Sequence, residues 1–477
     1  MRVLGLLCIS FLIASCASLP EPSVLYPAQL QTCALKLTNF KQEVQQQDVQ
    51  DAQLRWLPQY PHLAFDRFSL ALLPELQSPK DKTLWLNYVS RQAAIQRKVE
   101  FQNLPHKAGI NFDAQENCAA QLTAHTLNDK QFWEQITQYP PEIPSNYQDW
   151  QRVIGLYPIS QLFAAPAIDK EKTRIISDFI APQHDYIVKY GVNDKPSLNQ
   201  ATIQRWFHKA NEKSDLEWPL LTDSQITQLL TYYAPEFMVE SVSLDDKPGQ
   251  VEYRPDGRAA VNIKEPALYV SHSYTRFHGK ILLQLQYSLW FSNRTAKSSL
   301  DPYAGKFDGV LVRLTLDPQG QPYILDSIHH CGCYHMVFTL DPTLRFAPKQ
   351  AGTEAPITWY IYPNKKANSL RITLSHGEHM LKEVHWGNSS PKARSLSLLN
   401  YDQLRSLPLS EENNKSLFDE QGMLSASQRL ERFYLWPFGV KSPGAMRQSG
   451  HHATAFIGER HFDDAAMLEA LFLPPGK

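Results

Sequence analysis

The stretch from residue 310 to residue 335 reads VLVRLTLDPQGQPYILDSIHHCGCYH. Apolar side chains recur at every second position from 310 to 316, which predicts a strand. Asp, Pro, Gln and Gly at 317–320 form a turn signal, and residues 323–328 read as a second strand. The stretch therefore predicts a β-hairpin that ends in a cluster of three histidines and two cysteines at 329–335.

Further strands are predicted on both sides of this hairpin. Residues 283–289 alternate between apolar and polar side chains, and residues 370–374 form a strand that runs into His376 and His379. Before residue 240 the sequence is mostly helical, and its clearest helix follows a capping box that begins at Thr222. We therefore expect an α+β fold, with a helical N-terminal domain followed by a mainly antiparallel β domain and a mixed C-terminal segment.

The expected domain boundaries follow these changes of pattern. Residues 29–240 form the helical domain, residues 241–400 the β-rich domain with the His/Cys cluster, and residues 401–477 the mixed segment. A chain of 477 residues is too long for one hydrophobic core, which agrees with several domains. Asp308, which precedes a glycine, reads as a turn residue and not as a catalytic acid.

Composition and missing motifs exclude several classes of function. The chain has 47 basic and 48 acidic residues and a net charge of −1, whereas a nucleic-acid-binding protein needs a basic excess. The sequence has no Walker A motif and no Gly-x-Gly-x-x-Gly motif, so we expect no nucleotide binding. It also lacks the Gly-x-Ser-x-Gly motif of nucleophile-elbow esterases.

The N-terminus predicts the compartment. Met1 and Arg2 precede an apolar run, residues 3–12, that is too short to span a membrane as a stop-transfer helix. Ile-Ala-Ser-Cys follows at 13–16. This pattern resembles the lipobox of bacterial lipoprotein precursors, and the resemblance covers residues 1–16 only.

The lipobox resemblance implies an anchored envelope protein. Residues 1–15 would be the signal peptide and Cys16 the lipidated first residue of the mature chain, while Ala17 favours the outer membrane. Residues 16–28 would be a tether, since their prolines favour an extended chain. The body would be periplasmic and held to the membrane through its lipid.

Four cysteines remain once Cys8 and Cys16 are set aside. The envelope is oxidising, so disulfides are expected, and we favour a Cys33–Cys118 pair because both lie in the helical region. Cys331 and Cys333 are separated by one glycine, so a disulfide between them would be a strained, redox-labile ring. In a turn, the same spacing lets two thiolates converge on one metal ion.

The His/Cys cluster predicts a transition-metal site, because thiolate and imidazole are the usual ligands of zinc and copper. We expect zinc, or less strongly copper, on Cys331, Cys333 and His335, joined by His330 or by the distant His379. A closed set of four ligands would be structural, and this version is slightly preferred over a hydrolytic one. Further candidate ligands are His329, His376, His385, His451, His452 and His461.

Three alternatives stay open beside the structural metal site. If water could reach the metal, the chain would be a metal-dependent hydrolase with Glu378 as its base. It could instead be a non-enzymatic envelope module that binds a partner protein or a cell-wall component, or a thiol redox protein that uses Cys331 and Cys333. Residues 286–335 resemble a bacterial envelope family of unknown function, from which no activity carries over.

Overall fold

The computed structural model describes residues 26–474, except for 108, 183–185, 351, 365–366, 368 and 389–391. The expected signal peptide, Cys16 and the tether up to residue 25 lie outside the described residues. Within the described part, every helix is too short or too polar to cross a membrane.

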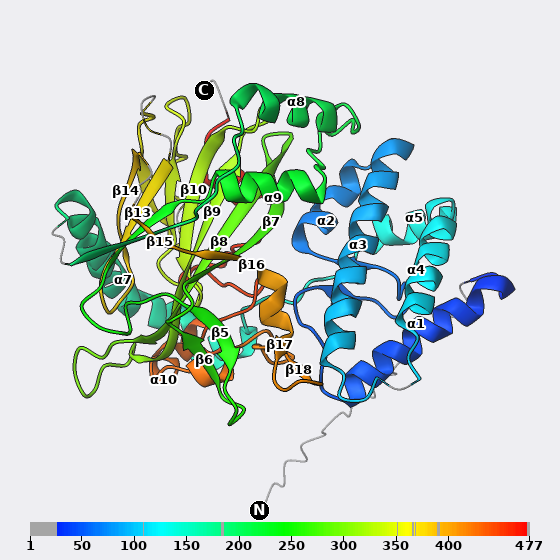
Figure 1. Ribbon diagram of the computed structural model, residues 1–477, viewed down its shortest axis with the longest axis horizontal. Helices are drawn as coiled ribbons and strands as arrows, with labels where there is room; N and C mark the ends of the chain where they lie inside the picture. Colours follow the sequence, from blue (N-terminus) through cyan, green and yellow to red (C-terminus); the bar gives the residue numbers. More distant parts are fainter. Residues whose placement is uncertain are drawn as a thin grey trace, which may run out of the picture.

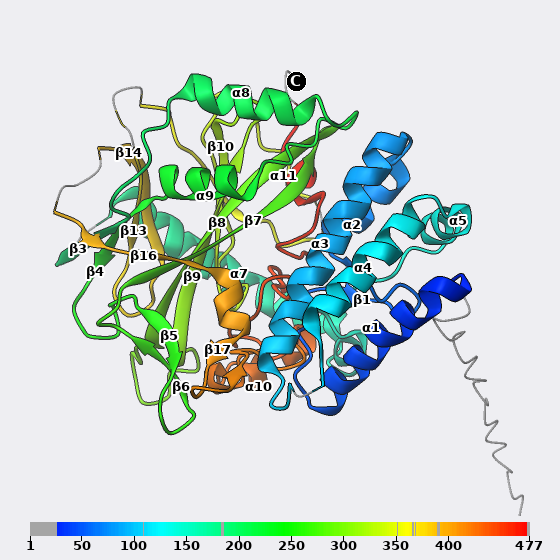
Figure 2. The same cartoon turned by 45° about the vertical axis from the view of Figure 1, so that its right-hand side comes forward.

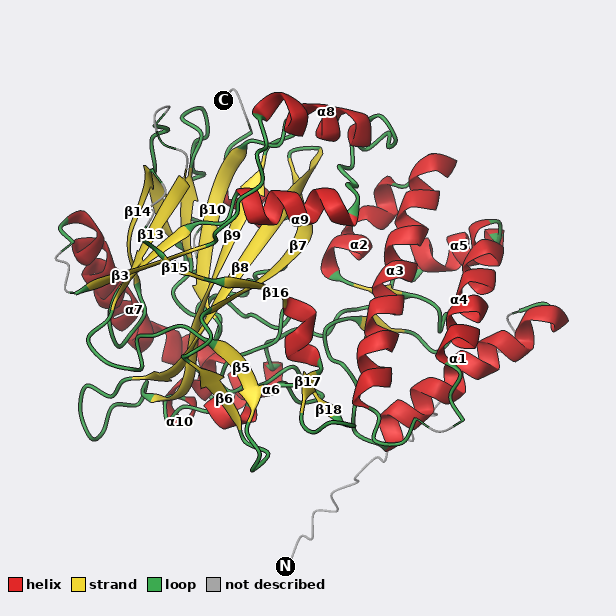
Figure 3. Ribbon diagram, in the orientation of Figure 1, coloured by secondary structure: helices red, strands yellow, loops and turns green. Residues whose placement is uncertain are grey.

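The fold is α+β, as the sequence predicts. Helices α1–α5 form a layer on one side of the molecule, and two β-sheets form the other side (Figures 1 and 2). The helices of this layer are α1 (Ala28–Gln46), α2 (Arg67–Leu72), α3 (Pro79–Asn103), α4 (Phe112–Leu127) and α5 (Lys130–Gln138). Figure 3 shows that the N-terminal layer is mainly helical, whereas the other side combines the two sheets with further helices.

The larger sheet has seven strands in the order β12-β11-β10-β9-β8-β7-β16. They are β7 (Ala267–Phe277), β8 (Lys280–Arg294), β9 (Gly305–Leu316), β10 (Pro322–His329), β11 (Met336–Thr339), β12 (Ile357–Tyr360) and β16 (Ser397–Asn400). Strands β7 to β11 are antiparallel neighbours, whereas β12 and β16 add to the two edges in parallel. The predicted hairpin is present as β9 and β10.

The two faces of this sheet differ in chemistry. On one face, Leu285, Tyr287 and Leu289 of β8 lie opposite apolar residues of β9 and belong to the main hydrophobic core. On the other face, Gln286 lies opposite Arg313. The C-terminal segment packs on this second face. The polar side chains of this face are therefore buried between the sheet and the C-terminal segment.

The smaller sheet has five strands in the order β14-β13-β4-β3-β15. They are β3 (Ile187–Gly191), β4 (Glu236–Glu240), β13 (Ser369–Leu374), β14 (Leu381–Gly387) and β15 (Arg394–Ser395). Strands β3 and β4 precede residue 240, inside the segment expected to be helical. They pair with each other, and each also pairs with a strand more than 100 residues later, β4 with β13 and β3 with β15; pairing over such distances leaves no local signal.

Helices α8 (Gln200–Asn211) and α9 (Asp223–Tyr232) lie over the sheets and not with the N-terminal layer (Figure 1). The predicted capping box begins α9: the Thr222 side chain accepts a hydrogen bond from the Gln225 N–H, and the Gln225 side chain accepts one from Thr222. In the N-terminal layer, Cys33 of α1 and Cys118 of α4 form a disulfide, the pairing that the sequence favours.

Helices α6 (Asp149–Ile154) and α7 (Tyr157–Ile180) connect the two halves. The C-terminal segment holds little helix. Residues 425–434 contain a 3-10 turn and the start of α10 (Arg432–Leu435), and residues 463–471 contain α11 (Met467–Leu471). Most of this segment is irregular and is fixed by contacts with the sheet.

Candidate functional site

A tight turn follows β10 and presents the two cysteines. The His329 N–H donates to the Cys333 carbonyl (3.0 Å), and the Gly332 N–H donates to the His329 carbonyl (2.8 Å). Gly332 has φ +90°, and a Cβ atom at this position would lie 2.2 Å from the Ala453 carbonyl oxygen. Only glycine fits here, because the C-terminal segment lies directly against the turn.

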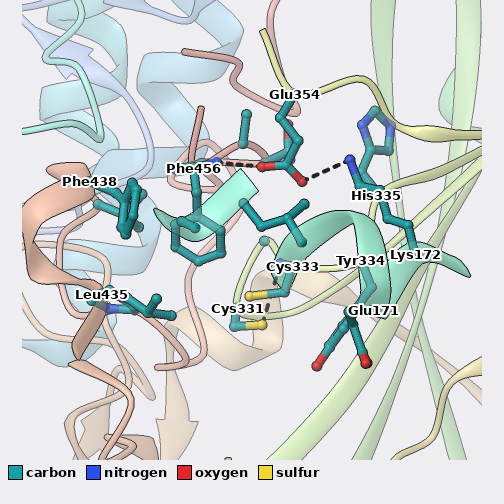
Figure 4. A pocket seen from close by; sticks show the side chains of 18 of the residues that line it. Glu171, Lys172, Cys331, Cys333, Tyr334, His335, Glu354, Leu435, Phe438 and Phe456 are labelled. Atoms are coloured by element: carbon teal, nitrogen blue, oxygen red, sulfur yellow. Dashed lines mark hydrogen bonds and ion pairs between the residues drawn. The ribbon is translucent and has the colours of Figure 1, made fainter. Parts of the chain in front are cut away.

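Both thiols of the turn are free, and their sulfurs lie side by side (Figure 4). The Cys331 side chain is buried, whereas Cys333 is partly exposed. The backbone N–H of Cys333 donates to the Cys331 sulfur at 3.4 Å. A thiol hydrogen bond to Cys331, together with burial, raises the pKa of Cys333 well above its usual range. Cys333 therefore keeps its proton when the pair is reduced.

The thiols form part of the wall of a cavity of about 200 Å³. Its other walls are mainly apolar, with Ala167 and Ile168 from α7 and Leu435, Phe438 and Phe456 from the C-terminal segment (Figure 4). Charged groups also reach the wall: Lys172 and Glu354 are paired at 3.2 Å, and Glu171, Glu431 and Arg460 line the same cavity. The cavity thus offers an apolar surface beside two sulfur atoms.

Glu431 is the ionisable group that the sequence analysis missed in this site. Its side chain is 7% exposed, and burial raises its pKa to about 7, against the opposing effect of nearby arginines. Glu431, Cys331 and Cys333 together line a second, very small cavity of about 10 Å³. A carboxyl group with this pKa can take up or release a proton near neutral pH.

Arg447 supplies a buried positive charge next to the thiols. Its Nε donates to the Cys331 carbonyl at 3.0 Å, and its other N–H groups donate to the carbonyls of Lys441, Ser442 and His451. Among the described residues, no carboxylate forms an ion pair with it. Burial lowers the pKa of the Arg447 guanidinium, but arginine stays protonated near neutral pH, and its charge favours a thiolate close by.

Two histidines of the cluster turn away from the sulfurs. His330 stacks on Trp290 with ring centroids 4.2 Å apart, its Nε2 lies 2.8 Å from the Ser288 hydroxyl, and burial lowers its pKa to about 3. The His335 Nε2 lies 3.6 Å from a carboxylate oxygen of Asp326, and burial lowers the pKa of His335 to about 4. Both are neutral rings held in the second face of the sheet.

His329 and His379 meet at a buried carboxylate instead of at the cysteines. The His379 Nδ1 lies 2.7 Å from one oxygen of Asp308, and the His329 Nδ1 lies 3.6 Å from the other. Burial alone would raise the pKa of Asp308, but hydrogen bonds from both rings hold it well below its usual range. Asp246 lies 3.7 Å from the other nitrogen of His379. The reading of Asp308 as a turn residue is wrong, because it is a buried residue of β9.

Glu378 lies in a cluster of positive charges. Its carboxylate contacts Lys297 (2.9 Å), Arg294 (3.0 Å) and Arg174 (3.5 Å). Burial would raise its pKa, but these three cations together lower it. A carboxylate bound in this way is a weak base, so the geometry gives the expected catalytic role no support.

The remaining candidate ligands are spread over the molecule. His376 is exposed, and His385 is 40% exposed beside Glu383. The rings of His452 and His330 are 6.4 Å apart, the His451 Nε2 binds a backbone carbonyl, and the His461 Nε2 accepts a backbone N–H. Within the described residues, no three His, Cys, Asp or Glu side chains converge in a metal-binding arrangement. The structure therefore places Cys331 and Cys333 side by side and His335 on the wall of the same cavity, and no third ligand converges with the two sulfurs among the described residues.

Comparisons with protein-family models, with curated protein sequences and with solved structures gave no significant match to this chain.

Proposed function

We propose that this chain is a thiol–disulfide exchange protein of the bacterial envelope that acts through Cys331 and Cys333. The observation that carries the proposal is the position of both sulfurs at the wall of an apolar cavity, next to Glu431 and Arg447. A titratable carboxyl group and a fixed positive charge are the two aids that thiol exchange uses, because the reacting species is the thiolate. The disulfide in the helical layer agrees with an oxidising compartment.

In the proposed reaction, the oxidised pair accepts two electrons from a substrate dithiol. A substrate thiolate attacks the sulfur of the more exposed Cys333, the Cys331–Cys333 bond breaks, and the electron pair leaves on the Cys331 sulfur. Arg447 stabilises this thiolate until Glu431 supplies its proton. A second substrate thiolate then attacks the substrate sulfur bound to Cys333, which releases a substrate disulfide and the reduced protein.

One feature favours this direction of exchange. A disulfide across a single residue is a strained ring, so reduction releases strain. The raised pKa of Cys333 makes it the poorer leaving group, so release of the substrate disulfide from Cys333 is the slower step. On α7, which lines the cavity, Leu162 and Phe163 are 69% and 79% exposed, a surface suited to an apolar polypeptide substrate.

The proposal is tested with a soluble form that begins at residue 17 and a synthetic peptide that has two cysteines flanked by leucines. The protein is oxidised, freed of oxidant and mixed anaerobically with an equal amount of reduced peptide. We expect the peptide to lose two thiols and the protein to gain two. The Cys331→Ser/Cys333→Ser variant, which keeps the disulfide of the helical layer, is the matched control. Equal oxidation of the peptide by both proteins would contradict the proposal.

Zinc or copper binding by the two sulfurs stays a prediction, and the same pair of proteins tests it. Elemental analysis after purification without a histidine tag measures metal per chain. About one zinc or copper ion per chain, lost in the double serine variant, would replace the exchange proposal with a metal site.

A further inference from the structure

A second cavity lies where the helical layer, the seven-stranded sheet and the C-terminal segment meet. Its volume is about 430 Å³, within the range of about 300–1,000 Å³ that small-molecule sites occupy. Figure 2 shows the C-terminal segment, drawn in red, passing between the sheet and helices α2 and α3. We propose that this cavity binds a saccharide, a function separate from thiol exchange.

The floor of the cavity is a polar stripe on the second face of the sheet. Ser271 and Ser273 of β7 and Gln284 and Gln286 of β8 line it. Gln286 Nε2 donates to the Ser273 hydroxyl at 2.8 Å, and that hydroxyl donates to Gln284 Oε1 at 3.0 Å. A sheet face beneath helices is normally apolar, so a row of hydroxyl and amide groups here indicates a polar occupant.

Four polar atoms among the lining residues have no hydrogen-bond partner in the described part of the chain. One is Arg67 Nε, which forms an ion pair with Asp463, and the other three are Gln53 Oε1, His452 Nε2 and Asp463 Oδ1. The His452 ring is 2% exposed, and burial holds its pKa well below the usual range, so its free nitrogen belongs to a neutral ring. Buried polar atoms are nearly always satisfied, and these three can all accept a proton from a ligand hydroxyl.

Aromatic rings complete the walls of the cavity. Phe68, Tyr88, Tyr274 and Phe462 line it from three different parts of the chain. A sugar ring has apolar C–H faces and polar hydroxyl edges, so it packs on aromatic rings while it hydrogen-bonds to amides and carboxylates. The combination of rings, amides and free acceptors at one place matches this chemistry.

The charges around the cavity favour a neutral ligand over a phosphorylated one. Arg67 pairs with Asp463 at 3.2 Å, and Arg313 pairs with Asp326 through Nε at 3.0 Å. Arg447 also lines the cavity, and its guanidinium donates to the carbonyls of Cys331, Lys441, Ser442 and His451. The donors of these three arginines are therefore already engaged, whereas a phosphate site needs free donors. A neutral or N-acetylated sugar of one or two rings is the class that the lining selects. Cell-wall fragments and storage sugars share this chemistry, so the test uses one probe from each.

The test is saturation-transfer NMR and calorimetry on the soluble form, with N,N′-diacetylchitobiose as the cell-wall probe and maltose as the storage-sugar probe. We expect one of the two to bind. The Gln53→Leu variant should weaken that binding at least about tenfold, since one lost hydrogen bond is worth about 1.4 kcal/mol. Gln138→Leu, on exposed helix α5, is the matched control and should bind as the unchanged protein does.

Two results would overturn the saccharide proposal. One is a lack of binding by both probes to protein that shows its normal cooperative thermal unfolding. The other is binding that Gln53→Leu leaves unchanged, which would place the sugar elsewhere. Neither result depends on Cys331 or Cys333, so the proposal stands or falls separately from thiol exchange.

Discussion

Gly332 gives the sharpest test of how the cysteine turn is held. At φ +90°, an alanine in the left-handed backbone conformation destabilises the fold by about 1–2 kcal/mol. Its Cβ would also lie 2.2 Å from the Ala453 carbonyl oxygen, and forcing packed backbone apart costs about 1–3 kcal/mol more. Ala453 cannot move freely, because it pairs with His461 in an isolated β-bridge. We expect Gly332→Ala to lower the free energy of unfolding by about 2–5 kcal/mol.

Gly257 provides a matched control for this substitution. It has φ +75°, and a Cβ atom there would meet nothing within 4 Å. Gly257→Ala should therefore lower the free energy of unfolding only by the effect of the backbone conformation, about 1–2 kcal/mol. Urea unfolding of both variants isolates the contact with the C-terminal segment as their difference, about 1–3 kcal/mol. Equal destabilisation of the two variants would refute the account of how the turn is packed.

Three further predictions concern buried groups. The pKa of Glu431 is raised to about 7, so its protonated carboxyl stabilises the fold fully below the unfolded pKa of 4.5, and this stabilisation is lost as pH rises through 7. Between pH 4 and pH 8, the Glu431→Gln variant should lose up to about 3 kcal/mol less stability than the unchanged protein, measured by urea unfolding. Parallel profiles of unfolding free energy against pH for the two proteins would contradict this prediction. Asp308→Asn should cost about 3 kcal/mol because it breaks the buried contact with His379, and a loss below 1 kcal/mol would disprove that role. Replacing Cys33 and Cys118, which lie 85 residues apart, by serine should cost about 4 kcal/mol, and an unchanged urea midpoint would count against it.

The elements that could be predicted from the sequence are those with local signals. The β9–β10 hairpin follows from alternation and a turn, and the start of α9 follows from a capping box at Thr222. Strands β3 and β4 were missed, because they are separated from each other by two helices and their other partners, β15 and β13, lie far along the chain. Local sequence carries little information about such pairings.

The candidate site stays a prediction, and the structure changes which residues surround its two cysteines. Successive side chains of an extended chain point to opposite faces. Histidines that are close in the sequence therefore need not be close in space, and His329, His330 and His335 do not come together. Glu431 and Arg447 reach the cysteines from about 100 residues away, through an irregular segment that has no periodic pattern. Neither residue carries a local signal of its role, and only the fold brings them to the cysteines.

A reversible redox pair of Cys331 and Cys333 is measured directly by mass-tag alkylation. The soluble protein is equilibrated in glutathione buffers from fully reduced to fully oxidised, and the tags are located by peptide mass. We expect both cysteines to lose their tags together in one two-electron transition, while the Cys33–Cys118 disulfide persists. Two fully tagged thiols at the most oxidising ratio would contradict it.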